Sequence, residues 1–170
     1  KGDFRLEERL MLETRVKFGG RERKPLFAIN DVVVTKNSGR MLRLKVFING
    51  SYFHEFPGDG LIVSTSTGST AYALSAGGPI VSPELDVIVL TPICPHTLFA
   101  RAIVTSGADD IRIELPSGRK DMILILDGQE EYPLRSGEGV AVRSAAARAR
   151  YARVTGPRFY GTVREKFNLT

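Results

Sequence analysis

Hydroxyl-bearing side chains are concentrated between Ser64 and Thr70 of this 170-residue chain. Gly58-Asp59-Gly60 and a short apolar run precede this stretch, Gly68 interrupts it, and Tyr72 follows it. Backbone N–H groups at a helix start, together with several hydroxyls, form a donor cluster that can hold a phosphate, a ribose or a purine edge. The stretch has neither the lysine of a P-loop nor the spacing of a dinucleotide fingerprint. Composition alone therefore also allows a Ser/Thr-rich loop that only caps a helix.

A second polar feature is the pair Asn30-Asp31, which lies inside the apolar run from Leu26 to Val34. Burying an unpaired amide or carboxylate costs roughly 1–3 kcal/mol or more, so both side chains need hydrogen-bond partners. Neighbouring side chains of a regular strand point to opposite faces, and both reach one ligand only at a strand end or a bulge. The pair therefore indicates either a ligand contact or a β-bulge with a turn-forming Asn-Asp.

The third polar feature is Asp127-Gly128-Gln129, where the apolar run from Met122 to Leu126 stops abruptly. Asp-Gly is ordinary hairpin chemistry, so a turn is the favoured interpretation. The remaining candidate groups are isolated in the sequence. His54, His96 and the single cysteine, Cys94, show no spacing typical of a metal site, a nucleophile–base pair or a catalytic triad.

Strands must position these features. The segment from Leu42 to Ile48 alternates in character with period two, which predicts a half-buried strand, and Asn49-Gly50 after it is a strong hairpin signal. A similar strand is predicted from Ile111 to Leu115, before a turn at Pro116-Ser117-Gly118. Strands buried on both faces are predicted at 26–34, 61–63, 87–90 and 122–126, with two shorter strands at 140–142 and 151–154. This pattern predicts a mainly β, layered, sandwich-like domain.

Two helices are expected. A short internal helix begins at Ser69 or Thr70 as its cap, runs through Ser75, and ends at Gly77-Gly78-Pro79. A second helix is expected in the tail from Pro157 to Leu169, where three apolar residues lie four apart on one face. The predicted organisation is one all-β domain over residues 1–156 followed by a helical tail over residues 157–170.

Composition limits the class of protein. With 42% hydrophobic and 25% charged residues, the chain has the composition of a globular domain, and its longest unbroken apolar run, 122–126, is too short to cross a membrane. One cysteine cannot form an internal disulfide, and no secretory signal is visible, so we expect a cytoplasmic protein. Because the chain begins at Lys1 without a methionine, we expect a processed chain or a piece of a longer one.

The charge balance is mildly basic, with 24 Lys and Arg against 19 Asp and Glu and a net charge of +5. Several of the basic residues fall near the end of the chain: Arg143, Arg148, Arg150, Arg153, Arg158, Arg164 and Lys166. Such a cluster can attract phosphates, but a solvated surface or an interface with an acidic domain is the favoured interpretation. Scattered arginines without interleaved aromatic residues are not typical of nucleic-acid binding.

Taken together, the three polar features resemble the NAD kinase family. The segment 58–79 is similar to the signature of that family, Asn30-Asp31 to its Asn-Glu pair, and Asp127-Gly128-Gln129 to its late Asp-Gly-Gln. The segments 92–98, 3–9 and 164–167 are similar as well, so the resemblance covers essentially the whole chain. It implies an enzyme that phosphorylates the 2′-hydroxyl of the adenosine ribose of NAD and gives NADP.

The resemblance also implies that part of the enzyme is missing. The family has an earlier α/β domain whose Gly-Gly-Asp-Gly motif binds ATP phosphates and supplies a general-base aspartate. Pro57-Gly58-Asp59-Gly60 is not that motif, so this chain is expected to be the C-terminal, NAD-binding domain, with no catalytic residue and no metal ligand of its own. The resemblance further implies ATP or polyphosphate as donor, Mg²⁺ or another divalent metal with ATP, a homodimer or homotetramer, and a tail that packs on the absent domain.

By the same resemblance, Asn30 and the start of the internal helix hold the adenosine end of NAD, Tyr72 offers a ring face, and Asp59 and Gln129 shape the rest of the pocket. The expected NAD-binding residues are Asn30, Asp31, Asp59, Thr67, Thr70, Ala71, Tyr72, Ala73, Leu74, Ser75 and Gln129. Ser66, where the family usually has proline, and Asp31, where it usually has glutamate, depart from the pattern. The alternatives are a lipid kinase of the diacylglycerol or sphingosine type and a non-enzymatic basic β module; the Thr-Gly-Ser-Thr-Ala-Tyr segment argues against the first.

Overall fold

The computed structural model describes residues 4–18, 21–22, 24–37, 39–118, 121–154 and 159–168. The strands are β1 (Arg5–Arg9), β2 (Leu12–Phe18), β3 (Arg21–Glu22), β4 (Leu26–Ala28), β5 (Asp31–Lys36), β6 (Leu42–Ile48), β7 (Ser51–Gly58), β8 (Gly60–Thr65), β9 (Val87–Ile93), β10 (Ile103–Ser106), β11 (Ile111–Glu114), β12 (Met122–Leu126), β13 (Glu130–Leu134), β14 (Gly139–Ser144) and β15 (Ala149–Arg153). The helices are η1 (Gly68–Thr70), α1 (Tyr72–Ser75) and α2 (Phe159–Lys166).

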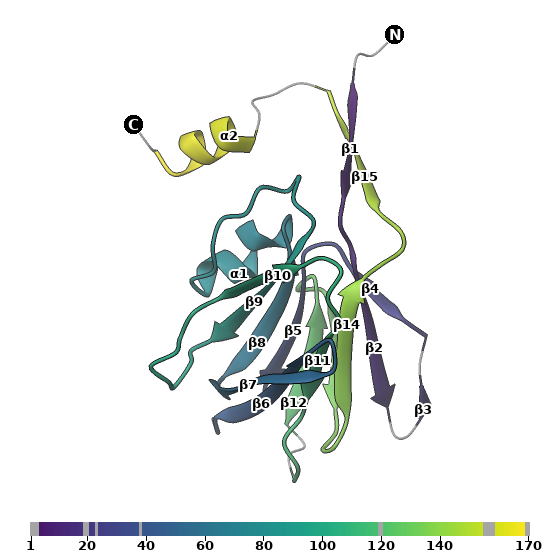
Figure 1. Ribbon diagram of the computed structural model, residues 1–170, viewed down its shortest axis with the longest axis vertical. Coiled ribbons are helices and arrows are strands. Elements are labelled where there is room, and N and C mark those ends of the chain that lie inside the picture. Colours follow the sequence, from purple (N-terminus) through teal and green to yellow (C-terminus); the bar gives the residue numbers. More distant parts are fainter. Residues whose placement is uncertain are drawn as a thin grey trace.

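Two antiparallel sheets face each other, which confirms the predicted layered β fold (Figure 1). One sheet has the strand order β10-β9-β8-β5-β12-β13, and the other the order β3-β2-β14-β11-β6-β7, with β4 paired to β2. Apolar side chains from both sheets, including Val32, Leu61, Leu44 and Ile113, form the main core between them. β1 and β15 form a separate two-stranded ribbon that extends beyond the sandwich (Figure 1).

The period-two pattern sets the faces of the strands. Leu42, Leu44 and Val46 of β6 are buried while the residues between them are exposed, as predicted. The turn after β6 has positive φ at both Asn49 (51°) and Gly50 (78°), as a tight two-residue hairpin requires.

The predicted strand over 26–34 is wrong in its extent. β4 ends at Ala28 and β5 begins at Asp31, and the two strands belong to different sheets. The chain crosses from one layer to the other at Ile29 and Asn30, which explains why polar residues interrupt an apolar run. The prediction that β12 is buried on both faces is also wrong, because buried and partly exposed residues alternate along that strand.

The predicted internal helix is interrupted. Its first turn is η1, Ala71 has non-helical backbone angles, and α1 follows as a single turn. Neither Ser69 nor Thr70 caps it: the Ser69 hydroxyl instead accepts the N–H of Val81 (3.0 Å) and donates to the carbonyl of Ser66 (2.7 Å). This hydroxyl ties the bend to Val81, twelve positions further along the chain.

The tail helix is confirmed over Phe159–Lys166. Its predicted ends at 157 and 169, and the proposed domain boundary at 156/157, lie outside the described residues. No helix within the described ranges is long and apolar enough to span a bilayer.

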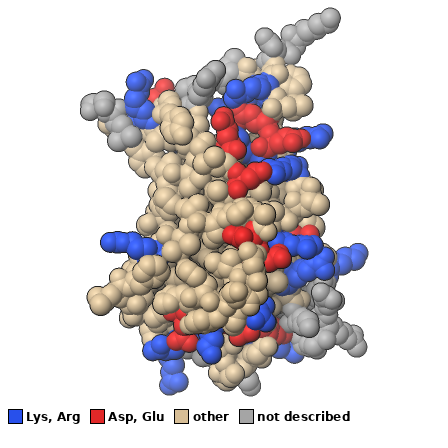
Figure 2. All heavy atoms as spheres, in the orientation of Figure 1, with Lys and Arg blue, Asp and Glu red and all other residues tan. Residues whose placement is uncertain are grey.

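Much of the basic tail is paired with acids. Arg143 lies 3.0 Å from Glu13, Arg148 2.6 Å from Asp86, and Arg150 3.1 Å from Glu8. On the face drawn in Figure 2, blue and red side chains are interleaved instead of forming one continuous basic surface. This arrangement agrees with a solvated surface, and Arg158 lies outside the described residues.

Candidate functional site

The hydroxyl-rich bend begins where the buried strand β8 ends. The Thr65 hydroxyl donates to the carbonyl oxygen of Ile29 (2.8 Å) and accepts the N–H of Gly68 (2.9 Å), while the Thr65 N–H donates to the carbonyl of Asn30 (2.9 Å). Gly68 lies so close to Asn30 that a Cβ on Gly68 would be 1.9 Å from that carbonyl oxygen. The bend and the Asn30 segment, which are distant in sequence, are therefore in direct contact.

Asp127 holds the segment that connects β4 to β5. The carboxylate of Asp127 accepts the backbone N–H groups of Ile29 (2.8 Å), Asn30 (2.7 Å) and Asp31 (3.0 Å). The N–H of Asp127 donates to the Asp31 carbonyl (3.0 Å), so the hairpin that carries Asp127 is joined to the start of β5 in both directions. The predicted pair Asn30-Asp31 thus lies at a strand end and not in a bulge.

Asp31 is the most unusual titratable group of this region. It is 4% exposed, and it is paired in register with Ser64 of β8, so the two side chains share one face of the sheet. Burial, and secondly the charge of Asp127, raise the pKa of the Asp31 carboxyl to about 6. A buried acid whose pKa is raised in this way is a candidate functional group.

A cavity of about 580 Å³ lies beside the bend. Ser66, Thr67, Thr70 and Leu74 form one wall, and the ribbon β1–β15 and helix α2 form the others. The walls are polar at the bend and more apolar at α2, where Phe159, Val163 and Phe167 line the cavity. This volume lies in the range typical of small-molecule sites, and such mixed walls suit a ligand with both a ring and hydrogen-bonding groups.

Unpaired hydroxyls line the polar wall. Ser66 Oγ and Thr67 Oγ1 are buried, and within the described residues neither has a hydrogen-bond partner. A buried polar atom without a partner carries a desolvation cost of about 1–3 kcal/mol, which a ligand group or a water molecule can remove. Two residues at the wall of the cavity therefore carry hydroxyls that have no partner among the described residues, and neither oxygen is exposed.

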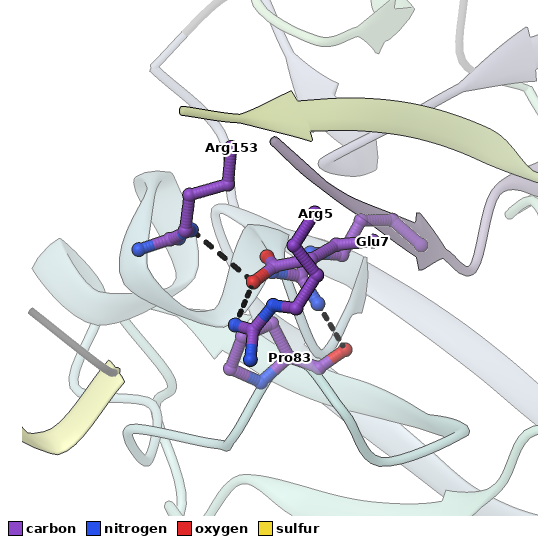
Figure 3. A network of polar contacts seen from close by, with 5 residues as sticks. Arg5, Glu7, Pro83 and Arg153 are labelled. Atoms are coloured by element: carbon purple, nitrogen blue, oxygen red, sulfur yellow. Dashed lines mark hydrogen bonds and ion pairs between the residues drawn. The ribbon is translucent and has the colours of Figure 1, made fainter. Parts of the chain in front are cut away.

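Cationic side chains from the ribbon surround Glu7 at the opposite wall (Figure 3). Arg5, Arg9 and Arg153 all pair with Glu7, and Arg9 also donates to the carbonyl of Pro83 (3.3 Å). Three guanidinium groups against one carboxylate leave an excess of positive charge near the cavity. Such an excess favours the phosphates of a nucleotide by Coulomb attraction.

The structure does not bring all of the expected NAD-binding residues to this cavity. Thr67, Thr70 and Leu74 line it, whereas Ala73 is fully buried in a small core with Val33 and Ile62. The other expected residues, which are not among those lining the cavity, are Asn30, Asp31, Asp59, Ala71, Tyr72, Ser75 and Gln129.

Of these remaining residues, Ala71 lies between η1 and α1, and the other six fall into four places. Asn30 and Asp31 lie directly behind the bend, and Gln129 is exposed in the hairpin of Asp127. Tyr72 and Ser75 are exposed on α1. Asp59 lies at the opposite end of β8 from the bend, where it pairs with Lys36 (2.7 Å).

Sequence reasoning missed two groups of residues at this site. Asp127 is predicted as a turn residue and as part of a motif that resembles the family, but not as a residue of the site, because Asp-Gly suits a hairpin without any further role. Glu7 and Arg9 belong to the segment 3–9 that resembles the family, but nothing assigned them to the site, since charged residues on an edge strand are common. Only the alternation Glu7-Glu8-Arg9, which places Glu7 and Arg9 on one face of β1, could have suggested the cluster.

The carboxylates of the site do not fit a dedicated divalent-metal centre. Both oxygens of Asp127 accept backbone N–H groups, and Asp31 is buried with a raised pKa. Among the residues that the structure describes, no three His, Cys, Asp or Glu side chains are grouped to hold a metal ion.

Comparisons with known proteins identify the family of the chain. The model of the ATP-NAD kinase C-terminal domain matches residues 29–154. The chain is 49% identical over 168 residues to an NAD kinase of Moorella thermoacetica, covering 97% of this chain and 53% of that protein. It is 45% identical over 166 residues to an NAD kinase of Heliobacterium modesticaldum, covering 97% of this chain and 59% of that protein. The chain thus spans little more than half the length of these relatives.

Solved structures show the same similarity. The crystal structure of yeast NADH kinase complexed with NADH superimposes with a TM-score of 0.89 at 30% identity, covering 97% of this chain and 49% of that one. An NAD kinase from Archaeoglobus fulgidus in complex with ATP has a TM-score of 0.78 at 24% identity, covering 94% of this chain and 60% of that one, which shows a shared fold. With a family model that matches most of its length, the chain belongs to the NAD kinase family, of which it represents the C-terminal domain.

Proposed function

We propose that this chain is the acceptor-binding part of an NAD kinase, which transfers a phosphoryl group from ATP or polyphosphate to the adenosine-ribose 2′-hydroxyl of NAD and gives NADP. The observation that carries the proposal is the direct contact between the hydroxyl-rich bend and the Asn30 segment beside a cavity of about 580 Å³. Relatives named NAD kinase that align with 97% of the chain support it.

Phosphoryl transfer to a hydroxyl depends mainly on positioning and on charge neutralisation. We therefore assign to this chain the placement of the acceptor. The hydroxyl-rich bend at Thr67 and Thr70 binds polar groups of the dinucleotide, and the apolar wall at Leu74 and Phe159 packs against a ring. Asn30 lies behind the bend and does not line the cavity, and we assign its amide to the ribose by the family resemblance. The missing N-terminal part binds the donor and supplies the general base.

Asp59 fits this proposal only through a second subunit. Strand β8 separates Asp59 from the bend, and six residues at about 3.3 Å each span roughly 20 Å. We propose that Asp59 contacts the acceptor of a neighbouring copy in a homodimer or homotetramer.

A divalent ion has no fitting ligand set among the described residues, so we propose that Mg²⁺ enters with ATP. When bound, it neutralises charge on the donor phosphates. The residues of this chain hold the acceptor whether or not the ion is present.

The test uses the full-length protein that contains this chain. We expect NADP formation from NAD and ATP, and no phosphorylation of diacylglycerol or sphingosine. Preferential phosphorylation of a lipid would overturn the proposal in favour of a lipid kinase. The isolated chain should form no NADP, and measurable NADP formation from it would refute the assignment of donor and base to the missing part.

A further inference from the structure

The carboxylate of Asp127 accepts three consecutive backbone N–H groups, those of Ile29 (2.8 Å), Asn30 (2.7 Å) and Asp31 (3.0 Å). The first bond is made by one carboxylate oxygen and the other two by the second oxygen. Hydrogen bonds to a charged acceptor are about twice as strong as those between neutral groups. The crossing between the two sheets is therefore held by a residue nearly one hundred positions away in sequence.

The hairpin turn itself does not require this carboxylate. Asp127 and Gly128 have φ values of 50° and 65°, and Asn49 and Gly50 have 51° and 78° in the turn between β6 and β7. The chain thus builds the same kind of turn with an asparagine, which is at least as favourable there. The acid is needed because an amide side chain offers one acceptor oxygen, whereas the three N–H groups use two.

The bonds of Asp127 complete the fixation of Asn30. Its N–H is bound by Asp127, its carbonyl accepts the Thr65 N–H (2.9 Å), and Gly68 packs on its backbone. With every backbone group of Asn30 held, only its side chain remains to bind a ligand. A displacement of about 1 Å in such a group can lower the rate about 100-fold.

We infer that Asp127 is a positioning residue for the acceptor, which acts by fixing the backbone of Asn30 and Asp31 against the bend. The inference rests on the proposed function, because it assumes that Asn30 binds the acceptor. Both carboxylate oxygens of Asp127 accept backbone N–H groups, so we assign it no contact of its own with the substrate. Its removal should therefore alter acceptor use through Asn30 and by no other route.

The primary test is Asp127→Asn in the full-length enzyme. The variant keeps the turn type and the size of the side chain, but it places an NH₂ group against one or more backbone N–H groups. We expect the KM for NAD to rise at least tenfold with a smaller change in kcat, because binding of the acceptor is weakened in ground and transition states alike. Hydrogen exchange in peptides covering residues 29–31 should become faster.

A double-mutant cycle separates positioning from general destabilisation. Asn30→Ala should also raise the KM, and adding Asp127→Asn to it should change the KM less than twofold, since the group that Asp127 positions is already gone. Full additivity of the two changes would overturn the inference. An unchanged KM in Asn30→Ala would instead overturn the proposed site itself, so the two failures are distinguishable.

Asp109→Asn is the matched control, because Asp109 also accepts a backbone N–H, that of Ser106 (3.1 Å), in a turn away from the site. It should leave the KM unchanged, and a rise equal to that in Asp127→Asn would overturn the inference. If Asp127→Asn does not fold, Asp127→Glu replaces it in the same cycle. That variant keeps both acceptor oxygens but displaces them by one methylene, so its smaller rise in KM should also disappear in Asn30→Ala.

Discussion

Gly68→Ala tests the contact on which the candidate site depends. A methyl group on Gly68 would lie 1.9 Å from the Asn30 carbonyl oxygen, 2.4 Å from its carbonyl carbon and 2.7 Å from its Cα. All three are backbone atoms, so no side-chain rotation relieves the clash. Because an ordinary carbon–oxygen contact exceeds about 3 Å, the bend and the Asn30 segment must move apart by on the order of 1 Å.

The magnitude follows from what this movement breaks. Overpacking in a closely packed region costs about 1–3 kcal/mol. The Thr65 N–H bond to Asn30 (2.9 Å) and the Gly68 N–H bond to Thr65 (2.9 Å) lie in the same contact, and losing each costs about 1 kcal/mol. We expect the free energy of unfolding to fall by roughly 3–5 kcal/mol and NAD use to fall about 100-fold.

The assay combines urea denaturation with steady-state kinetics of the full-length enzyme, measured at a temperature where Gly68→Ala remains folded. Gly39→Ala is the matched control, since Gly39 is exposed and a Cβ there meets nothing within 4 Å. Its effect on both quantities should be small. If Gly68→Ala shows the stability and the KM for NAD of the control, the close contact and the reasoning built on it are refuted.

Three further predictions concern single side chains. Asp31→Asn should make the stability of the protein less dependent on pH. The pKa of Asp31 is raised to about 6 in the folded protein, so Asp31 contributes stability that is present below about pH 4 and is lost as the pH rises through 6. In thermal melts from pH 4 to 8, the free energy of unfolding of Asp31→Asn should rise relative to that of the wild type by at most about 3 kcal/mol. A stability difference between the two proteins that stays constant with pH would contradict this. Tyr72→Ala should weaken NAD use by about 1–3 kcal/mol in kcat/KM, and unchanged kinetics would remove Tyr72 from the site. Asp59→Asn should cost less than about 1 kcal/mol of stability, because its pair with Lys36 is partly exposed, yet it should lower kcat/KM for NAD; an unaffected kcat/KM would remove Asp59 from the acceptor site.

The strand pattern was predictable because side-chain alternation is local. Leu42, Leu44 and Val46 had to face one side of a strand whatever their partners, and the Asn49-Gly50 turn had to reverse the chain. The division of 26–34 was not predictable from the same evidence. A change of sheet at Ile29 and Asn30 depends on which strands β4 and β5 pair with, and local periodicity carries no information about pairing partners.

Local sequence also predicted the candidate site only in part. Thr67, Thr70 and Leu74 of the expected residues line the cavity, while Ala73 belongs to a core and Asp59 lies at the far end of β8. Residues within one helical turn point in different directions, so a motif predicts a site region better than it predicts which of its members face the ligand.

By itself, the sequence determined the β class, the tight hairpins and the resemblance to the NAD kinase family that the hydroxyl-rich motif suggests. Each of these depends on residues close together in the chain. Only the tertiary structure decided that Asp127 holds the backbone at Asn30, that Gly68 packs on the same residue, and that Glu7 and Arg9 face the bend across a cavity. Those contacts join segments brought together by strand register and sheet packing. The physical reason is that a hydrogen bond or a close packing contact requires a short distance in space, and separation along the chain does not specify that distance.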